Sequence, residues 1–519
     1  MYRILSASYD TYITNKIIRN SFRATDANVG QSGTLDLFKL YGESISGSAD
    51  NPVELSRGLV KFDLSPLRSM ITKGDIDIND SSFSATLVLS DIYGGQTTPN
   101  NYKIIAFPLA QQFQEGIGRD IVTFQDLGSS NFITASYIDG VYKSWNLQGA
   151  MKSGSLGDSN IDVIVSGSLQ GPAGTQTLNL SSEQFFNTGK EDFEVDVTNA
   201  VSGTVSNQIN DHGFLIAYSG SYEKDEKSYF VKRFASKNSS REDKRPKIVI
   251  KFNDALQDNH KNFIFDVTGS IFLNNYHRGS LANILSGAAA TPITGHNCLK
   301  VKLLSGSFSK IVTGSQYAVG DVFKTGVYSA SFAISQYDVN MFNYLKNTTS
   351  ASFNAIWSSG TDNFPDRSDG LSSVAYLSSS LIIDQPTRTS FDHDQRRLLI
   401  TMKNLQPHYR KNDVVKLRIF IEDRDKDIVF KKTPIETPSQ IFENMYYQVK
   451  DAQSDRILIP FDVSKNSTKL SSDSKGMFFR FYMDSLPAGR TYVFEFLIKD
   501  FATDYFIKDI SAKFNVDLD

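Results

Sequence analysis

The histidines are the first residues to test for chemistry, because imidazole serves as both a general base and a metal ligand. The chain has six: His212, His260, His277, His296, His393 and His408. None stands in a His-Glu-x-x-His arrangement or beside a second ligand at metal-binding spacing. Asp392-His393-Asp394 flanks one imidazole with carboxylates, and a polar turn is the simpler interpretation than a metal or base role.

Two acidic runs could supply the clustered oxygens that calcium requires. In Asp75-Ile-Asp77-Ile-Asn79-Asp80, an Asp occupies the glycine position of an EF-hand loop, and Thr86 stands where the closing Glu belongs. The run from Glu422 to Asp427 is interrupted by Arg424 and Lys426. We expect both to be solvated turns, with calcium binding as the alternative.

Nucleophile and phosphate motifs are missing from the sequence. There is no Gly-x-Ser-x-Gly elbow, and Gly116-Ile-Gly118 and Gly189-Lys190 each lack a glycine that a phosphate-binding loop needs. The single cysteine, Cys298, forms no internal disulfide, cannot build a thiolate zinc site, and is expected to be a small buried hydrophobe. The sequence therefore predicts no catalytic, cofactor-binding or metal-binding residues, and we expect a protein that is not an enzyme. Carboxylate pairs for glycoside hydrolysis leave no signature in sequence spacing, so that activity stays an alternative.

Charge gives little reason to expect a nucleic-acid partner. The net charge of -3 provides no field to hold a polyanion. The most basic stretch, Lys224–Lys247, also contains acidic residues, so we expect a solvated face, with an anionic glycan or protein edge as the alternative. The opening MYRILSASYDTYI has no apolar leader core, and no later segment has eighteen apolar residues, so we expect no membrane insertion.

The elements that must position any site are mostly strands. Phe and Tyr are abundant, with 37 and 23 residues, and short alternating runs recur between Gly, Ser, Asn and Asp. The helix candidates are the stretch after Asp196-Val-Thr198, and Ser439–Lys450, where Ile441, Met445 and Val449 recur every four residues. The aromatic runs Phe478–Tyr482 and Tyr492–Phe496 are expected to be core strands. The sequence thus predicts an all-β fold.

At 519 residues the chain is too long for one core, and strand runs restart at two points. We predict an N-terminal jelly-roll-like β-sandwich over residues 1–254, with long Ser/Gly-rich loops between Leu89 and Glu191. A second β-sandwich is expected over residues 263–388 and a C-terminal immunoglobulin-like sandwich over 389–519.

The first segment resembles the DNRLRE-type β domain of bacterial surface proteins and virions. The most specific match is Arg57-Gly-Leu-Val-Lys-Phe-Asp-Leu-Ser65. The other motifs, in family order, are Asp10-Thr-Tyr-Ile13, Asn28-Val-Gly30, Leu35-Asp-Leu37, Ser84–Leu89, Phe193–Thr198, His212–Ile216, Phe234-Ala-Ser-Lys237 and Arg245–Ile250. The resemblance implies a jelly-roll-like fold and carries over no catalytic set. The region from Tyr93 to Lys190 is longer than the family pattern, and Val122-Thr-Phe124 replaces the usual Thr-Trp strand.

Physical reasoning assigns these motifs structural roles. In Leu59–Leu64 one face would carry Leu59, Lys61 and Asp63, as in a strand buried on one side only. Ser65 is expected to cap the segment before Pro66, and Asp196 and Thr198 are expected to satisfy free amides at a helix start.

Our leading hypothesis is that the chain is a structural subunit of a tailed-phage virion, located in the tail, baseplate or neck. The phage would be of the contractile-tailed, cyanophage-like kind. The partners of the subunit would be other virion proteins or further copies of itself, and it would be assembled in the host cytoplasm. The alternatives are a glycan-binding adhesin module or a capsid decoration protein. We expect Trp145 to be a core residue, as a lone Trp more often is, with a stacking platform for a glycan as the alternative role.

Overall fold

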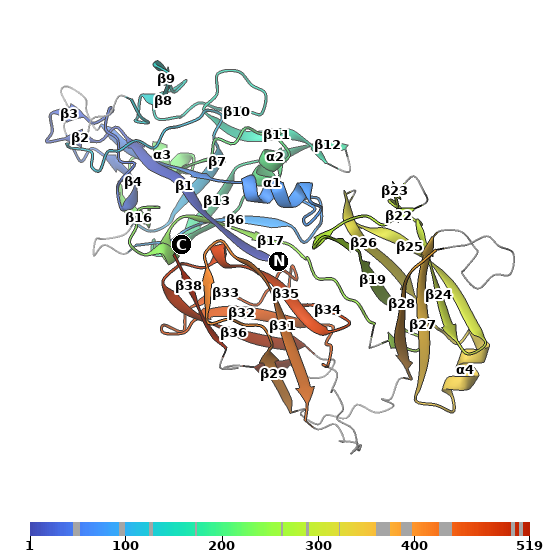
Figure 1. Cartoon of the computed structure of the whole chain (residues 1–519). Coiled ribbons are helices and arrows are strands. Elements are labelled where there is room, and N and C mark those ends of the chain that lie inside the picture. Colours follow the sequence, from blue (N-terminus) through green and yellow to red (C-terminus); the bar gives the residue numbers. More distant parts are fainter. Residues whose placement is uncertain are drawn as a thin grey trace.

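The computed structural model describes residues 1–44, 52–92, 99–123, 128–171, 174–260, 263–286, 290–320, 322–359, 374–385, 397–424, 439–499, 504–507 and 512–518. Strands dominate, and they form three successive groups of sheets along the chain (Figure 1). The helices that are described are short, the longest being eight residues. The fold class expected from the alternating runs, an all-β chain with several sandwiches, is confirmed.

The first group is a β-sandwich whose main sheet has the strand order β13-β7-β15-β5-β1-β17-β6-β14, with β4 pairing both β5 and β16. Its strands are β1 (Tyr2–Thr14), β4 (Thr34–Tyr41), β5 (Val53–Phe62), β6 (Ser84–Leu89), β7 (Tyr102–Pro108), β13 (Ser182–Phe186), β14 (Phe193–Asp196), β15 (Phe214–Tyr218), β16 (Tyr229–Ala235) and β17 (Lys247–Lys251).

Strand β1 belongs to both layers of this sandwich. Its first half pairs with β17, from Tyr2 to Ser6, and its second half pairs with β5. A bulge between Ala7 and Tyr9 lets the strand bend from one layer to the other. The main core lies between the layers, and Leu5 and Tyr12 enter it from the two halves of β1.

Two short helices close this sandwich, α1 (Ser65–Thr72) and α2 (Thr198–Val205). The helix predicted after Thr198 is confirmed, and Asp196 Oδ1 accepts the Thr198 amide at 2.8 Å. The Thr198 hydroxyl, in contrast, accepts from Ala85 N and so ties the helix to β6. The prediction that Ser65 caps α1 is wrong, because its amide instead donates to Asp63 Oδ1 at 2.9 Å.

An insertion covers the outer face of β5. Its strands are β8 (Thr134–Ile138), β9 (Val141–Ser144), β10 (Ser153–Ser155), β11 (Val163–Gly171) and β12 (Gly174–Asn179). Leu59 packs there against insertion residues, including Trp145 and Val163, and its exposed fraction is 0%. The expectation that this strand is buried on one side only is therefore wrong, because the insertion makes a second core on the other side.

The second group is a curled seven-stranded sheet with the order β18-β28-β27-β24-β25-β26-β19. Its strands are β18 (Phe263–Ile264), β19 (Gly269–Asn274), β24 (Leu299–Ser305), β25 (Phe308–Val319), β26 (Val322–Phe332), β27 (Ser350–Ser359) and β28 (Ala375–Asp384), with α4 (Val339–Leu345) beside them. Phe265 N donates to Asp384 O and Asp266 N to Ile334 O, so the chain between β18 and β19 bridges the two ends of the sheet. Trp357 lies fully buried in the core that the sheet encloses.

The third group is a sandwich of two sheets, β29-β31-β35-β34 and β30-β38-β36-β32-β33 with β37 beside β36. Its strands are β29 (Leu398–Met402), β30 (His408–Arg410), β31 (Val414–Asp423), β32 (Met445–Asp451), β33 (Ile457–Ile459), β34 (Ser471–Asp473), β35 (Gly476–Tyr482), β36 (Arg490–Lys499), β37 (Asp504–Ile507) and β38 (Lys513–Asp517). Phe479, Phe481 and Phe494 form the aromatic centre of its core, as expected for these strands.

The helix predicted over Ser439–Lys450 is wrong. Residues from Met445 onward form the central strand β32, which pairs with β36 and β33. A spacing of four is compatible with both a helix and a strand, because four is also a multiple of two. Here Tyr447 continues the inward row between Met445 and Val449, and all three lie in the core.

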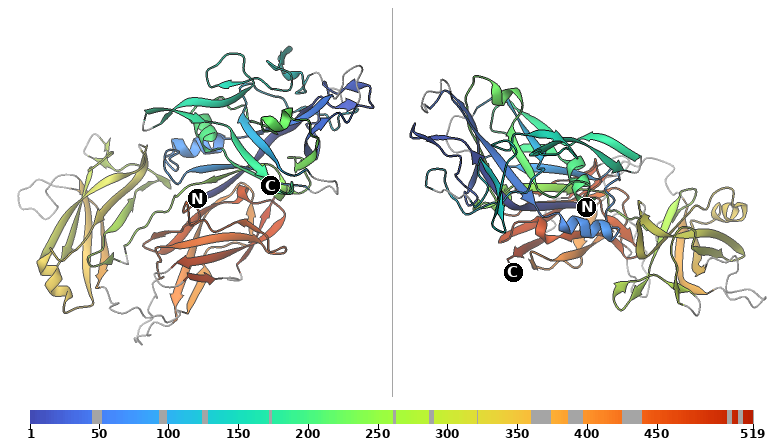
Figure 2. Two further views of the ribbon diagram at one scale, coloured as in Figure 1. Left: turned by 180° about the vertical axis from the view of Figure 1, so that it is seen from behind. Right: turned by 90° about the horizontal axis from the view of Figure 1, so that it is seen from above.

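The first and third sandwiches share a core. Tyr2, Val88 and Val249, on the outer face of one layer of the first sandwich, pack with the core of the third. Both views in Figure 2 place the third sandwich directly against the first, with the second group standing to one side. The segment that leads from the first sandwich to the second group is extended. Within it, Gln257 forms a parallel β-bridge with Ser472 at the edge of the third sandwich.

One carboxylate connects all three groups. Asp75, in the turn after α1, forms an ion pair with Lys324 Nζ of the second group at 2.6 Å and lies 3.5 Å from Arg480 of the third. The β25–β26 hairpin comes close to this turn, because a Cβ on Gly320 would lie 2.2 Å from Asp77 Oδ2. The expectation that this acidic run is merely a solvated turn is therefore wrong for Asp75.

We expect Asp75→Asn to loosen the second group without unfolding any sandwich. The pairs are partly exposed, so their loss should cost about 1 kcal/mol or less. Hydrogen exchange should quicken in the β25–β26 hairpin and the turn after α1, while the thermal unfolding midpoint changes little. Glu226→Gln, which changes an exposed carboxylate beside the short helix α3 (Ser221–Lys224), is the control. Unchanged exchange in the Asp75 variant would show that this carboxylate does not restrain the second group.

Candidate functional site

Motif residues that are far apart in sequence meet in one buried polar cluster of the first sandwich. Asp10 Oδ2 accepts the Lys237 amide at 2.6 Å, and Lys237 Nζ binds Glu115 Oε2 at 2.7 Å. The other oxygen of Glu115 accepts from Asp10 N at 3.0 Å. Sequence reasoning named Asp10 and Lys237 but missed Glu115, whose only signal is its place beside Gly116.

Asn28 holds the loop that carries Glu115. Its Nδ2 donates to Glu115 O at 2.8 Å, and its Oδ1 accepts from Gly118 N at 2.9 Å. A Cβ on Gly30 would lie 2.0 Å from Glu115 O, so no other residue fits there without moving the loop. The Gly116-Ile-Gly118 segment is thus a packed structural loop whose Gly118 amide is already bonded.

The Asp10 carboxyl has an unusual protonation equilibrium. Burial raises its pKa to about 7, and the neighbouring Glu115 carboxylate adds to the rise, while the Lys237 amide opposes it. Its Oδ1 is buried and has no hydrogen-bond partner among the described residues. The carboxylate of Glu115 and the ammonium group of Lys237 are hydrogen-bonded to other members of the cluster. We therefore interpret the cluster as a structural feature that holds β1 against the loop of Glu115.

We expect Asp10 to make stability depend on pH. An Asp in an unfolded chain has a pKa near 4, so the folded protein binds an extra proton between about pH 4 and pH 7. Its contribution to the free energy of unfolding should be fully present below this window and should be lost as pH rises through it. In urea denaturation, the difference between wild type and Asp10→Asn should fall across the window.

Asp63→Asn gives a control of opposite sign. Hydrogen bonds from Ser65 lower the pKa of Asp63, so its contribution should be lost as pH falls instead. Equal pH dependence of wild type and the Asp10 variant would contradict the assignment of a raised pKa.

The basic stretch Lys224–Lys247 is a solvated face only in part, because Lys224, Lys227 and Arg241 are exposed while other charges of the stretch pair within the sandwich. The Lys232 side chain has an exposed fraction of 0%, and its Nζ donates to Asp91 Oδ1 at 2.6 Å and to the carbonyls of Gly189 and Glu191 at 2.8 Å. Burial lowers the pKa of Lys232, while the pair with Asp91 opposes the shift. Arg233 likewise forms a two-bond pair with Asp36 at 2.7 Å. These charges therefore join strands.

Lys232→Ala should strongly destabilise the first sandwich. It leaves the Asp91 carboxylate and two carbonyls without their donor in a nearly dry environment, which typically costs about 3–5 kcal/mol. Lys224→Ala, at an exposed position of the same stretch, should change stability by about 0.5 kcal/mol or less. The free energy of unfolding from denaturant titration distinguishes the two, and equal values would show that the buried ammonium is dispensable.

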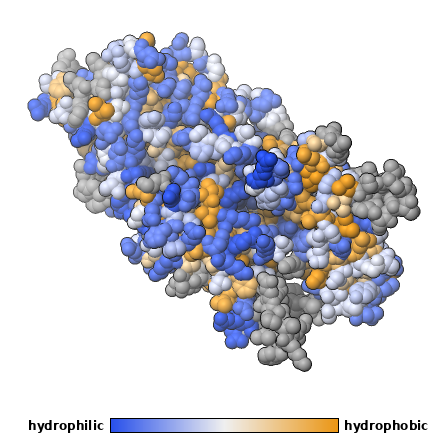
Figure 3. Space-filling view, viewed as in Figure 1, coloured by the Kyte–Doolittle hydropathy of each residue, from blue (hydrophilic) through white to orange (hydrophobic). Residues whose placement is uncertain are grey.

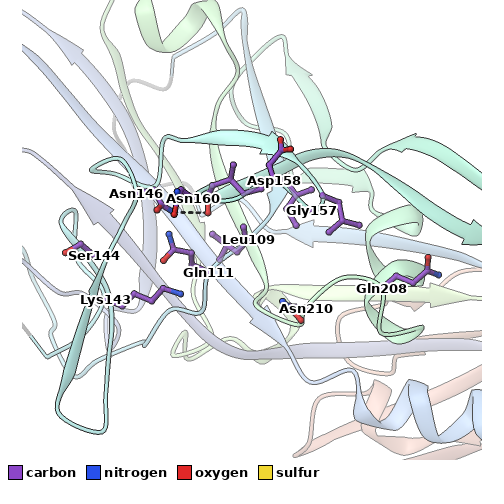
Figure 4. Close-up of a pocket in the computed structure, with 14 residues that line it drawn as sticks. Leu109, Gln111, Lys143, Ser144, Asn146, Gly157, Asp158, Asn160, Gln208 and Asn210 are labelled. Carbon is purple, nitrogen blue, oxygen red and sulfur yellow. Dashed lines mark hydrogen bonds between the residues drawn. The ribbon is translucent and has the colours of Figure 1, made fainter.

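The insertion carries a polar groove, a hollow of about 580 Å³ (Figure 4). Its lining is rich in amide and hydroxyl side chains: Gln111, Ser144, Asn146, Asn160, Gln208 and Asn210. Beneath it Asp162 is fully buried and accepts from Gln111 Nε2 and Asn146 N, both at 2.7 Å. Sequence reasoning missed the groove because its residues span a hundred positions and form no motif.

Trp145 is not a stacking platform. The ring is 5% exposed, packs in the insertion core, and donates from Nε1 to Asn131 O at 2.9 Å. The expectation that this Trp lies in a core is therefore confirmed, and the alternative role of stacking on a sugar is wrong.

The tip of the β8–β9 hairpin presents apolar side chains to solvent. Val141 is 67% and Tyr142 57% exposed, and Ile138 is also exposed. The rings of Tyr137 and Tyr142 lie 4.3 Å apart, which keeps the tip compact. Figure 3 shows that the face in view is largely hydrophilic, with apolar areas most evident over the second group.

The remaining candidates are the histidines, the acidic residues and the cysteine. Among the described residues, no three His, Cys, Asp or Glu side chains lie together as a metal-binding group. His260 shares a hydrogen bond with Ser379 Oγ at 3.0 Å, and His393 lies outside the described residues. Cys298 is half-buried against the second core, and burial raises the pKa of its thiol, which disfavours a reactive thiolate.

No helix in the described part of the chain is long and apolar enough to cross a bilayer.

Comparison with known proteins gives fold-level likeness only. No family model matches the chain, and no curated protein matches it. Among solved structures, the fibronectin(III)-like modules of Clostridium thermocellum CbhA match at 10% identity and TM-score 0.14, covering 51% of this chain and 91% of theirs. Titin A168–169 matches at 10% identity and TM-score 0.14, covering 51% and 96%. The Ig1-2 module of the Drosophila receptor tyrosine phosphatase DLAR matches at 9% identity and TM-score 0.15, covering 51% and 95%. Values this low define neither a family nor an activity for the chain.

Proposed function

We propose that this chain is a non-enzymatic structural subunit of a tailed-phage virion, positioned in the tail, baseplate or neck and assembled in the host cytoplasm. Its partners are other virion proteins or further copies of itself. The resemblance of the first segment to DNRLRE-type domains supports this class of protein. The coupling of the sandwiches through a shared core and the Asp75 pairs suits a spacer that holds its surfaces at fixed positions.

The observation that carries the proposal is the exposed apolar tip of the β8–β9 hairpin. Full burial of one such side chain contributes about 1.5–3 kcal/mol to an interface. A lasting contact would bury about 1,000 Å² or more, so the tip would act as an anchor within a wider surface.

Mass spectrometry of purified particles, and of tails separated from heads, tests the location. Peptides of this chain enriched in tails support a tail, baseplate or neck position. Enrichment in heads instead favours a capsid decoration protein, and absence from particles contradicts the virion role.

The double variant Val141→Asp, Tyr142→Ser should lower incorporation into particles by about tenfold or more, since it places a charge in the contact and removes apolar burial. Its unfolding midpoint should stay near that of wild type, because both side chains are exposed. Ile457→Asp, on an exposed position of β33 in the third sandwich, is the matched control. Immunoblots of purified particles give the measurement, and equal incorporation of the two variants would remove the hairpin from the interface.

The second candidate function is a glycan-binding adhesin module. The polar groove favours it, because its lining offers amide and hydroxyl groups that suit sugar hydroxyls, whereas Trp145 is buried.

A further inference from the structure

We propose that the polar groove of the insertion binds a neutral oligosaccharide. This inference assigns a site to the glycan-binding alternative and does not require the virion role. It rests on an unsatisfied buried group, on the chemistry of the lining, and on the balance of charge in the groove.

The unsatisfied group is the amide of Gln111. This side chain lines the groove, yet its exposed fraction is only 4%. Its Nε2 donates to Asp162 Oδ1 at 2.7 Å, which fixes the amide orientation, whereas the buried Oε1 has no hydrogen-bond partner in the part of the chain that the structure describes. A buried acceptor left without a donor costs free energy, so a small shift of the groove lining that lets a ligand hydroxyl donate to Oε1 gains the corresponding stabilisation.

The wall that holds Gln111 is rigid. Asp162 also accepts from Leu147 N at 3.0 Å and Lys152 N at 3.1 Å, while Asn146 Nδ2 donates to Ile161 O at 3.0 Å. The acceptor is therefore held in place before any ligand arrives. Preorganisation of this kind lowers the entropic cost of binding.

The lining matches hydroxyl groups better than other chemistries. Carboxamides carry both a donor and an acceptor, as hydroxyls do, so the exposed side chains of Asn160 and Asn210 can pair with sugar hydroxyls. The amides of Gln208 and Asn146, in contrast, already bond to neighbouring backbone groups. Figure 4 shows Gln111 and Lys143 toward one end of the groove and Gln208 at the other. The floor contributes aliphatic contacts from Leu109, Ile161 and Ile164, which suit the C–H faces of a sugar ring.

Charge argues against an anionic ligand. Among the described residues that line the groove, Lys143 and Asp158 are the only charged side chains, and their opposite charges sum to zero. A phosphate or sulfate group would need an excess of positive donors. A peptide would be expected to pair its backbone with a strand edge, whereas the polar groups here belong mostly to side chains. Without an aromatic platform, affinity should be weak, about millimolar.

Saturation-transfer difference NMR with the full chain is suited to such affinities. The probes are neutral glucan, galactan and chitin-type tetrasaccharides, with a neutral Gly/Ser tetrapeptide tested separately. We expect transfer to at least one tetrasaccharide, with affinity about tenfold weaker in Gln111→Leu. Asn210→Ala, at an exposed position of the lining, should also weaken binding and tests the site without disturbing the Asp162 network. Gln176→Leu, on an exposed position of β12 outside the groove, should bind as wild type does.

No transfer to any tetrasaccharide, equal binding by the Gln111 and Gln176 variants, or a preference for the peptide would each overturn the inference. Failure here would leave the virion role standing, because the groove variants do not alter the β8–β9 tip. Absence of the chain from particles would likewise leave the groove result intact.

Discussion

Strand β1 is the constraint on which the other parts of the molecule depend. Within thirteen residues it contributes Tyr2 to the shared core with the third sandwich, Leu5 and Tyr12 to the main core, and Ile13 to the insertion core. Asp10 enters the polar cluster from the same strand. The strand is therefore buried on both faces along most of its length, and the exposed positions, Ser6 and Tyr9, lie around the bulge. The bulge at Ala7 and Tyr9 makes this possible, since it turns the strand between layers.

Buried charge, more than apolar area alone, defines how these layers meet. Lys232 joins β16 to Asp91, and Lys237 joins Asp10 to Glu115, each across more than a hundred residues of sequence. Hydrophobic contacts tolerate sliding, whereas an ammonium group with three fixed acceptors does not. The pairs thus select one register among strands whose alternating patterns are similar. Their net contribution to stability is modest compared with the penalty for removing one partner.

The sequence predicts the strands well because period-two alternation is a local signal. The aromatic runs Phe478–Tyr482 and Tyr492–Phe496 were expected to be core strands, and they form β35 and β36 with Phe479, Phe481 and Phe494 in the core. The errors arise where a local pattern is ambiguous or a distant segment intervenes. Ile441, Met445 and Val449 satisfy helical and strand spacing equally. Leu59 is covered by an insertion that is about fifty residues away or more in sequence. Nothing in a mixed-charge stretch indicates that one of its lysines pairs with an Asp 141 residues earlier in the sequence. Lys232 was therefore expected on the surface, although it binds Asp91.

The polar groove could not be predicted from the sequence for a related reason. Catalytic and metal motifs are recognisable because chemistry demands particular residue types at fixed spacing, whereas Gln and Asn are common on any polar loop. What distinguishes Gln111 is the fixation of its Nε2 by Asp162 together with the lack of a partner for Oε1, and only the folded chain brings these about. A sandwich scaffold can carry an inserted segment, such as the one that contains β8–β12, without a change in the order of its own strands. In this chain the exposed hairpin tip lies in that insertion, and so does most of the groove lining, which Gln208 and Asn210 complete from outside it. The same segment that buries Leu59 thereby supplies the surfaces most able to recognise another molecule.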